Sequence, residues 1–149
     1  MSTIVLTQHT TATPEQFIAG LTDFGPGRAE LFPNSADDFL KVHEQGDEFA
    51  DVTEGSGGIW ERLHYDWSDP GHVVLTTVDS NVWGGRSGHT YTFTRHADGT
   101  TEVRAEVVRE GKNLKGRLLG VVLGIFGKNV LGGALAKTVK AIEASVPNS

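Results

Sequence analysis

Alternating hydrophobic and polar residues dominate the first two thirds of the chain. Residues 3–9 are rich in β-branched types and predict a first strand. From residue 37 to residue 111, strand-length runs are separated by turn residues such as Asp98-Gly99, which is typical of an antiparallel meander. Because the connections are short, strands that follow one another should pair. We predict six further strands, over residues 38–44, 48–54, 58–67, 72–80, 87–95 and 101–110.

Two short helices are predicted between the first strand and the meander. Thr13 is a good N-cap, Pro14 suits the first helical position, and Gln16 completes a capping box with Thr13. A helix should therefore cover residues 14–22. A Gly-Pro-Gly sequence then breaks the chain, and residues 28–32 have room only for a short second helix.

The pattern of the C-terminal residues predicts one long helix. Asn113 is its N-cap candidate, and the helix should end near residue 144. A break at Gly127 or at the Gly132-Gly133 pair would divide it into two segments. The apolar residues recur at three- and four-residue spacing, as a helix face requires. They include Leu114, Leu118, Val121, Val122, Ile125 and Phe126.

Glycines form a regular stripe in this predicted helix. Gly116, Gly120 and Gly124 recur every four residues and therefore share one helix face. Each glycine costs about 1 kcal/mol of helix propensity relative to alanine, so the stripe must have a compensating benefit. Two interpretations are open. The bare backbone either enlarges a gap between helix and sheet, or it allows close contact between them.

Composition and charge narrow the class of protein. At 149 residues the chain has the size of one domain, which we expect to span residues 1–149 and to need no disulfide. Because the sequence contains no cysteine, thiol chemistry is excluded. The N-terminus has no signal-peptide pattern, so we expect a cytoplasmic protein. Residues 1–108 carry 6 Lys/Arg against 17 Asp/Glu, whereas residues 109–149 carry 7 against 2. This acidic body would repel phosphate backbones, which argues against nucleic acid as a partner.

The element order resembles the helix-grip fold of the START and birch-pollen-allergen superfamily (SRPBCC), and among its branches the bacterial polyketide cyclase/dehydrase-like proteins. Four features carry the resemblance: the Thr13-Pro14-Glu15-Gln16 helix start, the aromatic-rich strand at 59–67, the Tyr91-Thr92-Phe93-Thr94 strand, and the closing helix. The resemblance implies an α+β fold in which a seven-stranded curved antiparallel sheet grips the long C-terminal helix. It implies a cavity but no specific activity, because one fold hosts many functions.

Strand alternation predicts which side chains face this cavity, since alternate residues share one face. In the strand at 58–67 the inward positions are odd, and Glu61 is the one charged residue among them. The odd positions of 87–95 include His89, and those of 101–110 end at Arg109, which we expect at the rim. The other inward residues of these three strands are Ile59, Leu63, Tyr65, Trp67, Ser87, Tyr91, Phe93, Val103, Ala105 and Val107.

The strand at 72–80 has no clear parity. The set Val73, Leu75, Thr77 and Asp79 competes with the set Val74, Thr76 and Val78 for the inner face. Asp79 is therefore a weaker candidate for the site. From all strands and the glycine stripe, the predicted ligand-binding residues are Ile59, Leu63, Tyr65, Trp67, Leu75, Tyr91, Phe93, Val107, Gly120 and Gly124.

Glu61, His89 and Arg109 are the candidate catalytic residues. Burial would raise the pKa of Glu61 and make it an acid or base, with His89 relaying a proton and Arg109 stabilising an enolate or carboxylate oxygen. The alternative is that these groups satisfy one another or face water. The six histidines form no HExxH or His-x-His pair, so neither a metal site nor another cofactor is predicted.

Three functions remain open at this level: binding or transport of a hydrophobic small molecule such as a lipid or polyketide, a cyclase/dehydratase-like enzyme, and a regulatory or interaction scaffold without ligand. The oligomeric state is undetermined. The run from Leu118 to Gly127 is apolar but only ten residues long, about half of a membrane span. Because lysines and arginines flank it, transient contact with an anionic membrane surface is one interpretation. The other is that its apolar side covers the sheet.

Overall fold

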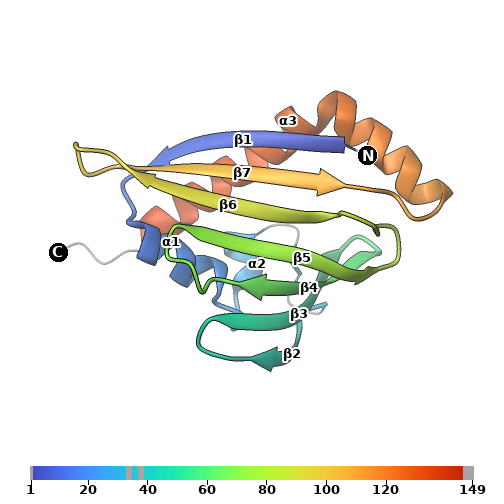
Figure 1. Ribbon diagram of the computed structural model, residues 1–149, viewed down its shortest axis with the longest axis horizontal. Helices are drawn as coiled ribbons and strands as arrows, with labels where there is room; N and C mark the ends of the chain where they lie inside the picture. Colours follow the sequence, from blue (N-terminus) through green and yellow to red (C-terminus); the bar gives the residue numbers. More distant parts are fainter. Residues whose placement is uncertain (1, 33–34, 37–38, 146–149) are drawn as a thin grey trace.

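The computed structural model describes residues 2–32, 35–36 and 39–145. The described chain forms an α+β arrangement of a seven-stranded sheet, two short helices and one long helix (Figure 1). Its elements are β1 (Ser2–Thr10), α1 (Pro14–Leu21), α2 (Arg28–Leu31), β2 (Lys41–Gln45), β3 (Phe49–Ser56), β4 (Ile59–Asp66), β5 (His72–Ser80), β6 (Gly88–Arg95), β7 (Thr101–Arg109) and α3 (Leu114–Ser145).

The sheet is curved and antiparallel, with strand order β1-β7-β6-β5-β4-β3-β2. Figure 1 shows this order from β1 at the top to β2 at the bottom. Strands that follow one another in the meander pair as predicted, and β1 joins the sheet by pairing with β7. The predicted start of the second strand, Asp38, lies outside the described residues, and the observed strand begins at Lys41.

The hydrogen bonds of the two predicted N-cap residues, Thr13 and Asn113, confirm where α1 and α3 begin. Thr13 Oγ1 accepts from the backbone N–H of Gln16 at 3.1 Å, and the Gln16 side chain accepts from the backbone N–H of Thr13 at 2.8 Å. At the start of α3, Asn113 Oδ1 accepts from the backbone N–H of Gly116 at 2.8 Å. The helix then continues for 32 residues without a break.

The glycine stripe serves close packing of α3. A Cβ on Gly116 would clash with the carbonyl oxygen of Val82, a Cβ on Gly124 would lie 3.3 Å from Ser2 Oγ, and a Cβ on Gly120 would touch the Trp83 ring at 3.9 Å. The bare backbone therefore lets α3 approach β1 and the loop after β5. The interpretation that these glycines enlarge the gap is wrong, and the close-contact interpretation holds.

The core lies on the concave side of the sheet, where α1, α2 and α3 cover it (Figure 1). Phe17 of α1 packs against Phe93 of β6 with ring centroids 5.4 Å apart. Ile142 anchors the C-terminal half of α3 in the same core, together with Leu135 and Val139. This packing fixes the helices at one end of the sheet.

A β-bulge resolves the parity of β5. Arg62 pairs with Asp79 but Leu63 pairs with Thr77, so Val78 is an extra residue that reverses the alternation. Leu75 and Thr77 therefore face the core. After the bulge Ser80 is buried, whereas Asp79 points outward and lies 3.6 Å from Lys112. Asp79 is not part of the inner face.

The N-terminal half of α3 exposes an apolar surface, which we call the α3 apolar face. It consists of Leu114, Leu118, Val121, Val122, Ile125, Phe126 and Val130. The apolar part of this helix is longer than the ten-residue run from Leu118 to Gly127. By length and composition alone α3 is long and apolar enough to cross a membrane, since its most apolar 18-residue window has a mean hydropathy of 1.7, and only 17% of that window is buried.

Candidate functional site

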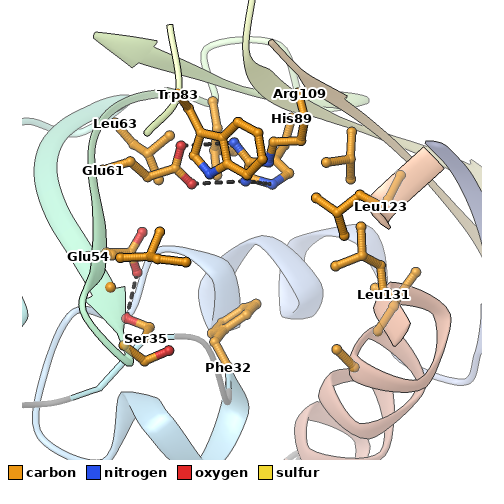
Figure 2. Close-up of a pocket in the computed structure, with 18 of the residues that line it drawn as sticks. Phe32, Ser35, Glu54, Glu61, Leu63, Trp83, His89, Arg109, Leu123 and Leu131 are labelled. Carbon is orange, nitrogen blue, oxygen red and sulfur yellow. Dashed lines mark hydrogen bonds and ion pairs between the residues drawn. The ribbon is translucent and has the colours of Figure 1, made fainter. Parts of the chain in front are cut away.

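A cavity of about 450 Å³ lies between the concave face of the sheet and α3. Strands β3 to β7 and helix α2 form its walls together with α3. Figure 2 shows Leu123 and Leu131 of α3 on one side, facing Glu54 and Glu61 on the other. Most of the lining side chains are apolar, and the charged ones lie in two clusters.

The first cluster joins the three candidate catalytic residues. Arg109 donates from both terminal nitrogens to the two carboxylate oxygens of Glu61, each at 2.9 Å. Its Nη2 also donates to His89 Nε2 at 2.9 Å. The Trp83 ring stacks beside the guanidinium, whose Cζ lies 5.2 Å from the ring centroid. Arg109 is only 9% exposed, so its predicted position at the rim is wrong.

Glu61 is held as a carboxylate. Burial alone would raise its pKa, but the charge of Arg109, the proximity of His89 and hydrogen bonds from Arg109 and Thr77 together lower the pKa below its ordinary value. Thr77 Oγ1 donates to Glu61 Oε2 at 2.9 Å. The predicted raised pKa is therefore wrong, because the sequence did not reveal that Arg109 would make two hydrogen bonds to this carboxylate.

His89 is neutral in this cluster. Burial, followed by the positive charge of Arg109, lowers its pKa from 6.5 to about 4, although Glu61 opposes the shift. Arginine only donates, so Nε2 of His89 must accept and the ring proton lies on Nδ1. Nδ1 is buried and has no hydrogen-bond partner among the residues that the structure describes.

The second cluster is centred on Arg28 of α2, which is 2% exposed. Its Nε donates to Glu54 Oε1 at 2.6 Å and its Nη2 donates to the Tyr65 hydroxyl at 3.0 Å. The Tyr65 hydroxyl donates in turn to Glu54 Oε2, and Ser35 Oγ donates to Glu54 Oε1 at 2.8 Å. The rings of Phe24 and Phe32 flank the guanidinium. A complete ion pair therefore sits in the wall of the cavity.

Solved structures match this arrangement, although no protein-family model and no curated protein matches the sequence. A START superfamily protein from Mycobacterium smegmatis matches with a TM-score of 0.69 and 12% identity, over 98% of this chain and 97% of that one. The Zhui aromatase/cyclase from Streptomyces sp. R1128 matches with a TM-score of 0.69 and 14% identity, over 97% and 95%. This chain has the START-like helix-grip fold.

A third helix-grip structure is the di-domain ARO/CYC BexL from the BE-7585A biosynthetic pathway, with a TM-score of 0.64 and 13% identity. The match covers 99% of this chain and 51% of BexL. The predicted helix-grip fold class is thus confirmed, and the resemblance to START and polyketide cyclase structures holds at the level of the fold. At these identities the likeness concerns the fold alone.

The helix-grip cavity includes only part of the predicted ligand-binding set. Ile59, Leu63, Tyr65, Leu75, Tyr91 and Val107 line it. Phe93 lies outside it because its ring packs on Phe17, and Trp67 follows the end of β4 and packs at the edge of the core. Gly120 and Gly124 face Trp83 and Ser2 instead, since that side of α3 packs on the protein.

Sequence reasoning missed Arg28 and Glu54. The signal for Glu54 was present: Ala50 and Val52 alternate with it on the buried face of β3, so Glu54 is a lone acid on an apolar strand face, just as Glu61 is. Arg28 gave no such signal, because a four-residue helix has too little periodicity to define a buried face.

Proposed function

We propose that this protein binds an apolar small molecule, such as a lipid or a polyketide, in the cavity between the sheet and α3. The cavity itself carries the proposal. Its volume of about 450 Å³ falls in the range of roughly 300–1,000 Å³ that is typical of ligand sites. Apolar side chains of β4, β5 and α3, among them Leu63, Leu75 and Leu123, surround the few polar groups. That composition favours a hydrophobic ligand with few polar atoms.

The two ion pairs favour an uncharged ligand. Arg28 and Arg109 are each neutralised by their own glutamate, so the wall residues that the structure describes offer neither a free cation nor a free carboxylate. A charged ligand would have to displace a buried partner, which is costly. Tyr91, whose pKa burial raises to about 12, lines the cavity as a neutral hydroxyl. A carbonyl or hydroxyl group on the ligand fits these walls best.

The α3 apolar face supports a contact with an anionic membrane surface, where such a ligand would enter and leave. Val122, Phe126 and Val130 are exposed and also line the cavity, so its mouth opens on this face. Residues 111–142 contain six lysines and arginines and no acidic residue. Exposed apolar area beside cations is the pattern of helices that lie on anionic membranes. We therefore propose that the α3 apolar face contacts an anionic membrane rather than a partner protein.

A cyclase/dehydratase-like enzyme is the second candidate, because Glu61, His89 and Arg109 converge at one wall of the cavity. In the resting geometry Glu61 already accepts three hydrogen bonds and His89 Nε2 accepts one from Arg109. Neither group is free to take a proton from a ligand until the cluster rearranges. This occupancy favours binding over catalysis.

Native mass spectrometry of protein purified from its own host tests the binding proposal. A mass above that of the bare chain, followed by extraction of an apolar compound, is the expected result. Ala134→Phe should reduce the bound fraction because Ala134 lines the cavity, whereas Ala136→Phe, on the same helix but outside the lining, should not. A bare mass for every form, together with tight binding of another protein, would favour the scaffold alternative and overturn the proposal.

The enzyme candidate is tested on the same extracted compound. Wild type and Glu61→Gln are each incubated with it, and the mass of the recovered compound is compared. A conversion that wild type performs and Glu61→Gln does not would identify an enzyme. Recovery of the unchanged compound from both supports a binding protein. The cytoplasmic location expected from the sequence is part of this proposal, and fractionation of host cells checks it.

A further inference from the structure

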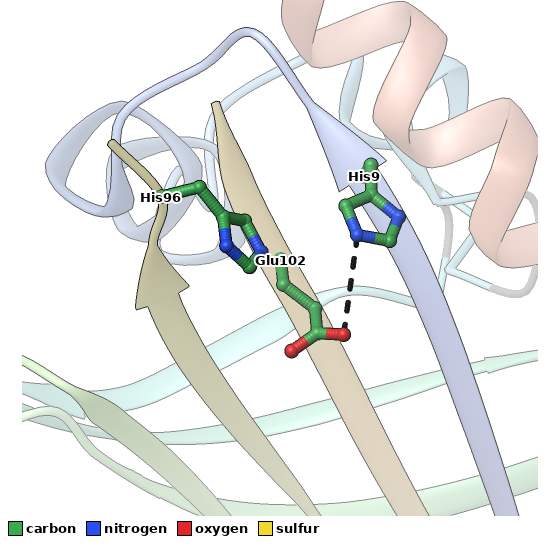
Figure 3. Close-up of side chains that lie close together, drawn as sticks. All are labelled: His9, His96 and Glu102. Carbon is green, nitrogen blue, oxygen red and sulfur yellow. Dashed lines mark ion pairs between the residues drawn. The ribbon is translucent and has the colours of Figure 1, made fainter. Parts of the chain in front are cut away.

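Two histidines and a glutamate meet on the outer face of the sheet, away from the cavity. His9 of β1 and Glu102 of β7 are cross-strand partners, and His96 follows the last residue of β6. Their neighbours Thr10 and Thr101 are buried on the inner face, so strand alternation directs His9 and Glu102 outward. In Figure 3 the Glu102 carboxylate lies below the two imidazole rings, and a dashed line joins it to His9.

We propose that His9, His96 and Glu102 form a binding site for a divalent transition-metal ion such as Zn²⁺. One nitrogen of each imidazole and one oxygen of the carboxylate lie within 4.8 Å of one another. In a tetrahedral zinc site the ligand bonds measure about 2.0–2.2 Å, which puts neighbouring ligand atoms roughly 3.3 Å apart. Small side-chain rotations close that difference.

The present contacts leave the ligand atoms available. His9 Nε2 and Glu102 Oε1 are 3.9 Å apart, which is an ion-pair distance but too long for a hydrogen bond. The two imidazole rings lie nearly parallel, with centroids 5.6 Å apart and an interplanar angle of 27°. The side chains of His9 and Glu102 are 62% and 37% exposed, so an ion reaches them from solvent.

The ligand types select the ion. Two imidazoles and one carboxylate suit Zn²⁺, Ni²⁺ or Cu²⁺ better than Ca²⁺ or Mg²⁺, which prefer oxygen ligands. Three protein ligands leave a further position for water. The formal charge of residues 1–108, with 17 acidic and 6 basic side chains, also attracts cations to this part of the protein.

A bound ion would connect the ends of three adjacent strands. His9, Glu102 and His96 come from β1, β7 and the end of β6, which neighbour one another in the sheet. Since the folded chain brings the three ligands together, metal binding should stabilise the folded state. This site is independent of the cavity and of the ligand proposed for it.

Isothermal titration of metal-free, tag-free protein with ZnCl₂ tests the site. Mutation of residues that only support metal ligands typically costs about 10- to 100-fold in metal affinity, and loss of a ligand itself should cost at least as much. His9→Gln and His96→Gln should therefore bind zinc more than about tenfold more weakly than wild type. His72→Gln is the control, because His72, which lies 3.1 Å from Asp69, belongs to no group of three candidate ligands among the described residues. This variant should bind zinc as wild type does.

NMR of the histidine rings provides a second readout on the same samples. Addition of ZnCl₂ should shift the ring signals of His9 and His96 and leave those of His64 in place. Circular dichroism checks that each of the histidine variants is folded. Absence of zinc binding by wild type, or equal affinity in His9→Gln and wild type, would overturn the proposal.

Discussion

Glu54 of β3 and Glu61 of β4 stand directly opposite one another in the sheet, yet each is neutralised by a different arginine. Directly opposed side chains share a face, and two like charges at such positions destabilise a strand pair. Arg28 reaches Glu54 from α2, and Arg109 reaches Glu61 from β7. The four charges that the described residues place in the cavity wall therefore sum to zero, and each pair depends on its arginine.

Removal of Arg28 should destabilise the protein strongly. Arg28→Met leaves Glu54 buried without its cation, and breaking a buried pair in this way typically costs about 3–5 kcal/mol. Urea unfolding measures the loss. Arg62→Met is the matched control, because Arg62 pairs with Asp51 at a partly exposed site and its loss should cost much less. Equal losses in the two variants would contradict the central role of the Arg28 pair.

Acid should destabilise the fold through His89. Its pKa is lowered from 6.5 to about 4, so between these values the unfolded chain binds a proton that the folded chain does not. Stability should fall as the pH drops through this window, by up to about 1.4 kcal/mol per pH unit from this one group. Urea unfolding at several pH values between 6.5 and 4.5 measures the slope.

The His89→Gln variant isolates this effect, since glutamine binds no proton. Its stability should depend on pH less steeply than that of wild type over the same window. A slope that His89→Gln leaves unchanged would show that His89 does not titrate as its buried environment requires.

Two glycines of α3 should respond in opposite ways to alanine. Gly116→Ala places a Cβ against the Val82 carbonyl, so the helix must shift, at a cost of about 1–3 kcal/mol. A Cβ on Gly133 would meet nothing within 4 Å, so Gly133→Ala should gain up to about 1 kcal/mol of helix propensity. Thermal unfolding compares them. A stabilised Gly116→Ala variant would argue against close packing of α3.

The α3 apolar face should bind anionic vesicles. Wild type should sediment with phosphatidylglycerol vesicles more than with phosphatidylcholine vesicles, and salt should weaken the binding because cations contribute to it. Ile125→Asp should reduce binding severalfold, since Ile125 is 69% exposed. Val78→Asp is the control, as Val78 is 54% exposed on β5. A wild-type dimer that Ile125→Asp dissociates, without vesicle binding, would show instead that a second copy covers this face.

The sequence alone determined the elements and the faces of most strands. A period of two placed Glu61, His89 and Arg109 on the inner face of β4, β6 and β7, and the capping residues Thr13 and Asn113 marked the helix starts. These features are local, because backbone geometry makes neighbouring residues alternate or recur on one face whatever the rest of the chain does. The element order carries the resemblance that implies the fold class, and the shared inner face identifies the members of the first polar cluster but not their contacts.

Tertiary structure alone decided how the polar groups pair. Arg28 meets Glu54 across 26 residues and Arg109 meets Glu61 across 48, and the pairing with Arg109 reverses the expected pKa shift of Glu61. The bulge at Val78, the contact of Gly116 with Val82 and the approach of His96 to His9 also depend on register and packing between elements. Periodicity fixes the face on which a side chain lies, but only the folded chain fixes its partner, because contact energies depend on distances of a few ångströms.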